Sequence, residues 1–153
     1  MKIFIIIIVV IFIGLAVYYG RYFFINKQVQ EDLPEEVMKN IDQASTKTGA
    51  FIGADALHRG SGTAKIITDS SGKKILRLEE DFSVTNGPDL YVYLTKNENP
   101  SSEDDLGDLI NLGRLKGNQG SQNYETNVDI DAYNTVVIWC QQFGVLFAHA
   151  VLK

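Results

Sequence analysis

The chain begins with a long apolar run and then changes to short segments in which apolar and polar residues alternate. Residues 3–19 carry no charged side chain. At ~1.5 Å per residue in a helix they cover ~25 Å, close to the ~30 Å hydrocarbon core of a bilayer. The tyrosines at the end of the run suit a membrane interface. The pattern predicts a transmembrane signal-anchor over residues 1–25.

A cleaved signal peptide is the alternative for this segment. Gly14 and Ala16 are small residues of the kind that precede a cleavage site. The apolar run is longer than a signal peptide requires, however, and bulky side chains follow Ala16 directly. The anchor is therefore the preferred interpretation.

Residues 26–47 show a weaker, helical periodicity. Pro34 suits the first turn of a helix, and the two glutamates that follow it favour a helix N-terminus. Apolar side chains recur at helical spacing, which predicts a short helical connector that packs one edge on the following domain. These apolar positions are Leu33, Val37, Ile41 and Ala44.

The remaining chain, residues 48–153, alternates between apolar and polar residues over short runs. The sequences DSSG at 69–72 and NGP at 86–88 are typical of turns. Because no helical pattern of normal length interrupts these runs, they predict an all-β domain, either an antiparallel sandwich or a barrel. The strand candidates are residues 62–68, 74–79, 90–94, 110–115, 135–141 and 145–152.

Charge and motif content narrow the function classes. The net charge is −5, and residues 1–27 contribute +3, which leaves −8 for the remainder. An acidic domain repels phosphate backbones, so no nucleic-acid partner is expected. The chain lacks GxSxG and HExxH and has only two histidines, which excludes these hydrolase motifs and a three-histidine metal site. The domain is therefore not expected to be an enzyme of these common types.

Cys140 is the single cysteine, so the chain forms no internal disulfide. In a strand it shares one face with Val136 and Ile138, whereas Trp139 points to the other face. A cysteine in such a run is either a small core residue or, if it is accessible and its pKa is lowered, a reactive thiol. Both interpretations remain open at this point.

A copper site would require Cys140 together with His58 and His149. If residues 142–144 form a hairpin turn, His149 lies ~13 Å along the strand from the position opposite Cys140. Direct ligation by both side chains would then need a bulge or a long loop. A copper site is therefore disfavoured, and no metal ligands are assigned.

Residues 48–152 resemble the DM-thirteen domain family, also called the electron-transfer DM domain. The most specific part is YNTVVIWCQQFGVLF at 133–147, in which an aromatic residue and a β-run precede Trp-Cys and a phenylalanine follows. The supporting pieces are His58 with GSGTA at 60–64, DFSVTNGPDLYVYL at 81–94 and LGRLKGNQGSQNY at 112–124. His149 departs from the small residue expected there, so it is either a surface residue or an added ligand.

The resemblance implies a β-sandwich related to DOMON-type domains, displayed on the extracytoplasmic side of the cell membrane. It also implies that Cys140 acts as a redox thiol or as the ligand of a prosthetic group, for which haem is the candidate. Trp139 and Phe143 would shape the pocket of this group, and His58 would modulate it. The expected function is a membrane-tethered electron-transfer or thiol-redox module that acts on a redox partner.

A non-enzymatic binding or adhesion module at the cell surface is the alternative. In that case Cys140 packs the core, and the polar loops at 97–108 and 117–127 contact a cell-surface protein. The sequence assigns no oligomeric state.

Overall fold

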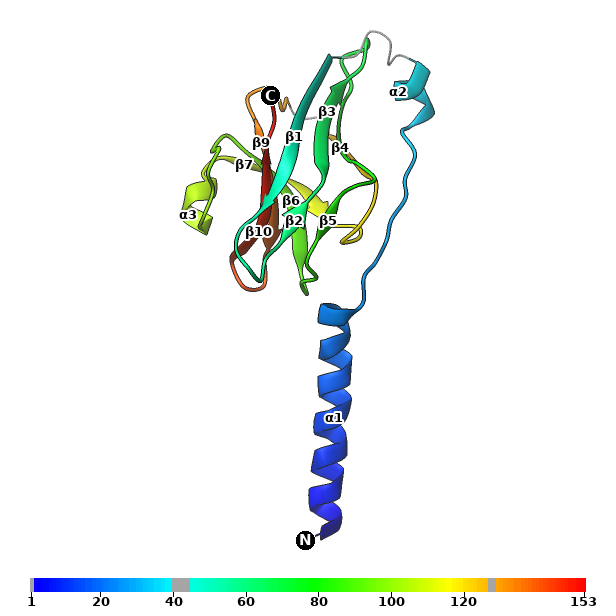
Figure 1. The fold of residues 1–153 in the computed structure, drawn as a ribbon, viewed down its shortest axis with the longest axis vertical. Helices are drawn as coiled ribbons and strands as arrows, with labels where there is room; N and C mark the ends of the chain where they lie inside the picture. Colours follow the sequence, from blue (N-terminus) through cyan, green and yellow to red (C-terminus); the bar gives the residue numbers. More distant parts are fainter. Residues whose placement is uncertain (1, 40–44, 127–128) are drawn as a thin grey trace.

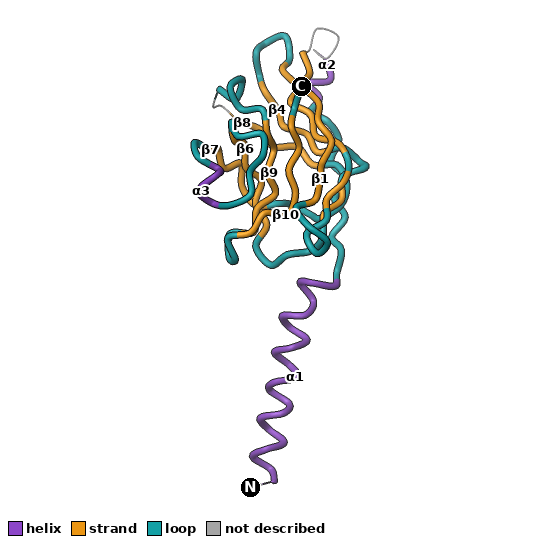
Figure 2. The backbone as a smooth tube through the Cα atoms, turned by 60° about the vertical axis from the view of Figure 1, so that its left-hand side comes forward, coloured by secondary structure: helices purple, strands orange, loops and turns teal. Residues whose placement is uncertain are grey.

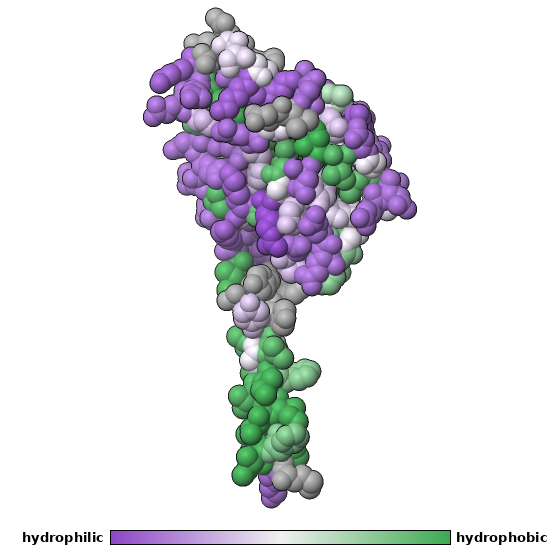
Figure 3. All heavy atoms as spheres, turned by 180° about the vertical axis from the view of Figure 1, so that it is seen from behind, coloured by the Kyte–Doolittle hydropathy of each residue, from purple (hydrophilic) through white to green (hydrophobic). Residues whose placement is uncertain are grey.

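The computed structural model describes residues 2–39, 45–126 and 129–153. Helix α1, Lys2–Phe24, projects from one end of a β domain and carries the N-terminus at its far tip (Figure 1). The described side chains from Ile3 to Tyr18 are exposed, and they form the apolar shaft below the mostly polar domain in Figure 3.

The predicted transmembrane helix is wrong for this structure. Within the residues described above, no helix is both long and apolar enough to cross a membrane. The prediction of a single-pass membrane protein with its domain on the extracytoplasmic side depends on this helix and is also wrong.

The segment after α1 is extended and runs along the outside of the β domain (Figure 1). We call residues 26–34 the strap. The strap leads to helix α2, Glu35–Lys39, at the opposite end of the domain. The helix predicted over 26–47 is thus reduced to α2, because backbone groups of the strap bond to the domain rather than to one another. Residues 40–44 lie outside the described residues, and β1 begins directly after them.

Eight of the strands form a single antiparallel sheet in the order β7-β6-β9-β10-β1-β3-β4-β8, and β2 and β5 form a small second sheet. One short helix, α3, Glu103–Leu106, precedes β7. The strands are β1 Ser45–Gly53, β2 Gly60–Ser61, β3 Thr63–Thr68, β4 Lys74–Leu78, β5 Ser83–Val84, β6 Leu90–Thr95, β7 Leu109–Arg114, β8 Gln122–Thr126, β9 Thr135–Cys140 and β10 Val145–Val151.

Strand β1 belongs to both halves of the large sheet. Its residues 45–50 pair with β3, and its residues 51–53 pair with β10. The sheet therefore curls as one piece until its end strands β7 and β8 approach each other, which gives a nearly closed barrel (Figure 2). The predicted β-sandwich is corrected accordingly. Alternation in the sequence identifies the inner and outer faces of strands, but it does not say whether two sheets stay separate or share a strand.

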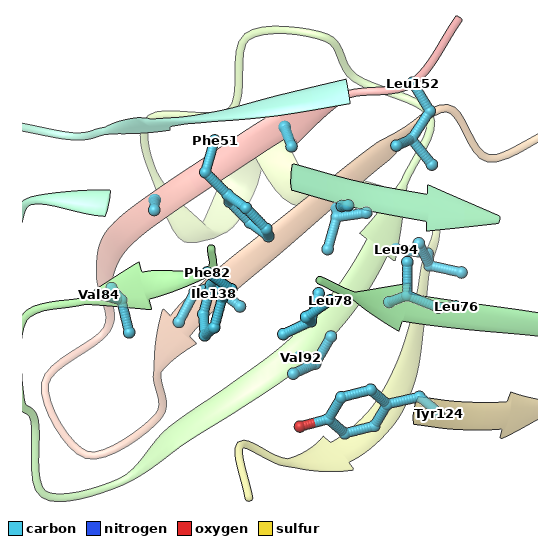
Figure 4. Packing of buried hydrophobic residues seen from close by; sticks show 14 of the residues in the cluster. Phe51, Leu76, Leu78, Phe82, Val84, Val92, Leu94, Tyr124, Ile138 and Leu152 are labelled. Atoms are coloured by element: carbon cyan, nitrogen blue, oxygen red, sulfur yellow. The ribbon is translucent and has the colours of Figure 1, made fainter. Parts of the chain in front are cut away.

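The inner face of the barrel holds the main apolar core. Side chains from both halves of the sheet meet there, including Phe51 of β1, Leu78 of β4 and Ile138 of β9 (Figure 4). Burial of this apolar surface is the main force that holds the two halves together. Other core members labelled in Figure 4 are Leu76, Phe82, Val84, Val92, Leu94, Tyr124 and Leu152.

Gly49 marks the tightest passage of β1 past β10. A Cβ atom at this position would clash with the carbonyl oxygen of Val151 and lie 2.8 Å from its carbonyl carbon. Because backbone atoms cannot rotate away, Gly49→Ala should lower the free energy of unfolding by about 1–3 kcal/mol in a urea titration. Ala50→Ser, at the exposed neighbouring position, should change it by less than about 0.5 kcal/mol. Equal stabilities of the two variants would contradict the close approach.

Candidate functional site

Strand β9 carries Cys140 and Trp139 on opposite faces. All of its residues are buried, because β6 and β10 flank it and both of its faces are covered. Val136, Ile138 and Cys140 share one face, as the alternation of the sequence predicts, and this face points into the barrel core. The opposite face of β9 contributes to a second, outer cluster, which consists of Tyr93, Leu106, Val137, Trp139 and Leu146.

The side chain of Cys140 is sealed inside the barrel. It is 0 % exposed, and its strand neighbours are Leu90 of β6 and Val145 of β10. Directly after it, the exposed turn 141–144 closes the β9–β10 hairpin, and the Gly144 N–H donates to the Cys140 carbonyl oxygen at 2.9 Å. Since the thiolate is the reactive form of cysteine, a thiol without solvent contact is inert while this packing lasts.

His58 lies at the rim of the core, in the loop between β1 and β2. Its ring centroid is 4.4 Å from that of Phe147, which belongs to the same cluster as Cys140. The imidazole Nδ1 is 2.7 Å from the Asp55 carboxylate, which also accepts the backbone N–H groups of Leu57 and His58. These hydrogen bonds lower the pKa of Asp55 to about 2, and the bond with the His58 side chain contributes most. The Asp55–His58 pair therefore fixes this loop, and Phe147 links it to the core.

The structure does not gather the other predicted site residues around the sulfur. Trp139 packs in the outer cluster, on the far side of β9 from the core. Phe143 is 60 % exposed in the hairpin turn. His149 faces Val137 across the β9–β10 ladder, away from the position opposite Cys140, and burial lowers the pKa of its ring. Of the predicted residues, only His58 approaches the cluster of Cys140, and it does so through Phe147.

Two pockets near the start of β6 share Pro88 and Arg114 in their walls. Leu90, the strand neighbour of Cys140, closes the first pocket, whereas Cys140 lines neither of them. The first, of about 480 Å³, is lined by Ile25, Lys27, Asn86, Gly87, Pro88, Leu90, Arg114, Leu115, Lys116, Gly117 and Asn118. The second, of about 590 Å³, is lined by Pro88, Asp89, Tyr93, Glu103, Leu106, Leu109, Arg114, Trp139, Gln141 and Gln142.

Haem ligated by Cys140 does not fit this arrangement. An axial ligand must face a space that admits the macrocycle. Cys140 instead faces the packed core, with Leu90 between it and the first pocket. In the described part of the chain, no three His, Cys, Asp or Glu side chains converge as a metal site would require.

A polar cluster surrounds Glu31 of the strap, and it was not predicted from the sequence. The Glu31 carboxylate accepts hydrogen bonds from the Lys116 ammonium at 2.8 and 2.9 Å and from the Asn123 N–H at 2.8 Å. Burial alone would raise the pKa of Glu31, but these bonds and the charges of Lys116 and Arg77 outweigh it and hold the pKa below its usual value. The sequence signal for this cluster was the pair of glycines in GNQG at 117–120, because glycine permits another segment of backbone to approach closely.

Comparison with known proteins identifies the family of the domain. A family model described as Electron transfer DM13 matches residues 51–152, which is about two thirds of the chain and includes Cys140. No curated protein and no solved structure matches. The description of the matching family assigns the domain an electron-transfer-related role. The chain therefore belongs to the Electron transfer DM13 family.

Proposed function

We propose that the domain transfers electrons through the thiol of Cys140, which reacts only when the β9–β10 hairpin opens. The observation that carries this proposal is the position of Cys140 as the last residue of β9, next to the exposed turn 141–144. The family description supports the electron-transfer part. The burial of the sulfur requires the opening step.

Opening of the hairpin is less costly than unfolding of the barrel. Proteins open locally with free energies well below that of global unfolding, first where few apolar contacts hold the chain. All four residues of the turn 141–144 are exposed, whereas Cys140 and the strand before it are buried. Displacement of the turn together with Val145 would bring water to the sulfur without disturbing the middle of β9.

The chemistry assigned to the exposed thiol is exchange with a disulfide of a partner protein or of a small thiol compound. Cys140 gives its proton to water, and its sulfur bonds to one sulfur of the disulfide. The other sulfur leaves as a thiolate and takes up a proton, so Cys140 is oxidised and the leaving sulfur is reduced. A thiol of a separate donor dithiol then attacks the Cys140 sulfur and releases the first partner in its fully reduced form, and the donor's second thiol displaces Cys140 as the donor closes its own disulfide. Two electrons thus pass from the donor dithiol to the partner disulfide, and Cys140 is restored.

Two glycine variants test the opening step. Gly144 lies in the hairpin turn with a φ of +62°, and Gly107 lies after α3 with a φ of +57°. A side chain at either position adds about 1–2 kcal/mol of backbone strain. Gly144→Ala should therefore speed the labelling of Cys140 by a thiol reagent about 5- to 30-fold relative to Gly107→Ala, at matched global stability.

One result of this labelling experiment would contradict the opening step. If the two variants label at the same rate, and this rate equals that of global unfolding, Cys140 is an inert core residue. The recognition module then becomes the better function, since the complete burial of the sulfur is the observation that favours it.

Substitutions of Cys140 test its packing role independently of its reactivity. Cys140→Ala leaves a small cavity and should cost about 1–2 kcal/mol of unfolding free energy. Cys140→Ser should cost more, about 2–3 kcal/mol, because a hydroxyl is placed among apolar side chains without a partner. Denaturant titrations measure both values. If serine were tolerated as well as alanine, the sulfur would have a polar or hydrated surrounding, contrary to the sealed core.

A further inference from the structure

The strap is bound along its length by the polypeptide that leads into β8. The N–H groups of Val29 and Glu31 donate to the carbonyl oxygens of Gln119 and Ser121 at 2.9 and 3.0 Å. The Lys27 N–H donates to the Asn118 side chain at 2.7 Å. These bonds are spaced as in an extended peptide that lies beside the edge of a sheet, and such main-chain bonds are the usual source of affinity in this mode of recognition.

Glu31 is the side chain that the surface recognises. Besides the bonds to Lys116 and Asn123, the Ser121 hydroxyl and the Arg77 guanidinium donate to the Glu31 carbonyl oxygen at 2.9 and 3.1 Å. Both the side chain and the backbone of this one residue are therefore bound. Charge-assisted hydrogen bonds of this kind are stronger than neutral ones and discriminate against residues without a carboxylate.

The surface is shaped for a backbone rather than for side chains. A Cβ atom at Gly117 would clash with the Lys27 carbonyl oxygen and lie 2.6 Å from a methyl group of Val29. A Cβ atom at Gly120 would clash with the Val29 carbonyl oxygen. The three atoms nearest to a Cβ at Gly117 all belong to the strap, so the lack of a side chain at this position serves the contact with the strap.

We propose that residues 116–124, with Arg77, form a recognition groove for an extended acidic segment, and that the chain fills this groove with its own strap. The groove lies within the range that matches the family, whereas its occupant, residues 26–34, lies before that range. The groove and its ligand are thus separable parts. A glutamate at the position of Glu31, within an extended backbone, is the feature that a segment needs in order to bind there.

Tethering explains how the polar contacts described above keep the strap in the groove. A segment joined to its binding site by a short linker has an effective concentration in the millimolar range, so weak contacts suffice for occupancy. A free peptide of the same sequence cannot compete until the tethered strap is weakened. Weakening the strap without altering the groove is therefore the way to reveal the site.

Glu31→Gln and Gly117→Ala in the full chain separate the strap from the groove. Hydrogen exchange of the Val29 and Glu31 amides should become at least about tenfold faster in both variants, because each loses about 1.4 kcal/mol or more of strap binding. Asp32→Asn is the matched control: it removes the adjacent charge, but the bond from Asn123 goes to the Asp32 carbonyl oxygen, so exchange should not change.

A fluorescent peptide with the sequence of residues 26–34 then reports on the groove. It should bind Glu31→Gln at least about tenfold more tightly than the unaltered chain, where the tethered strap competes. It should not bind Gly117→Ala, whose groove is blocked, and a peptide with glutamine in place of the glutamate should bind neither variant. Fluorescence anisotropy measures each of these five pairings of peptide and chain.

Three results would overturn the proposal. The first is unchanged exchange of the strap amides in both variants. The second is equal binding of the peptide to Glu31→Gln and Gly117→Ala, or no binding to Glu31→Gln when its strap is released. The third is a dimer of the unaltered chain that dissociates in Glu31→Gln, because the strap would then occupy the groove of a second copy.

Discussion

The barrel depends on the hydrogen bonding of β1 to strands on both of its sides. Residues 45–50 bind β3, residues 51–53 bind β10, and the Thr48 and Lys153 backbones exchange two further bonds. Without this shared strand the two halves of the sheet would lose the hydrogen-bonded ladder that joins them on this side, and would depend mainly on apolar contact across the core. Because β1 joins them, the core is enclosed on both sides, and β9 lies deep in one half with both of its faces covered.

Enclosure of β9 determines what its cysteine can do. In a strand with one solvated face, Cys140 or Trp139 would meet water. Here the inner face is packed with the core, and the outer face is covered by the cluster around Tyr93 and Leu106. Under the proposed function, reaction of the thiol therefore requires movement at the end of the strand, because Cys140 lines neither of the two pockets near β6. Cys140 is thus enclosed in the core, one residue before the exposed turn of the β9–β10 hairpin.

Period-two patterns were sufficient to predict the β domain and the face that Cys140 shares with Val136 and Ile138, because alternation is a local property of strands. Which face points inward was not predicted, since Val137 and Trp139 on the other face are also apolar. Closure into a barrel was not predictable, since it depends on one strand pairing on both sides. Of the helix expected over residues 26–47, the described residues form only α2, because the backbone of the strap is bound by residues far along the chain. Glu31 was missed for the same reason: one glutamate among several acids has no sequence signature when its partners, Lys116 and Asn123, are distant.

The path of the strap has a mechanical consequence. A pulling force applied through α1 does not reach β1 directly, because the chain is first held by the bonds of Lys27, Val29 and Glu31 to the loop before β8. These contacts lie in series along the strap, so the load falls on them before the barrel strands feel any tension. The strap would therefore detach from the domain before any barrel strand separates. Its release would lengthen the chain between the apolar helix and the domain while leaving the barrel intact.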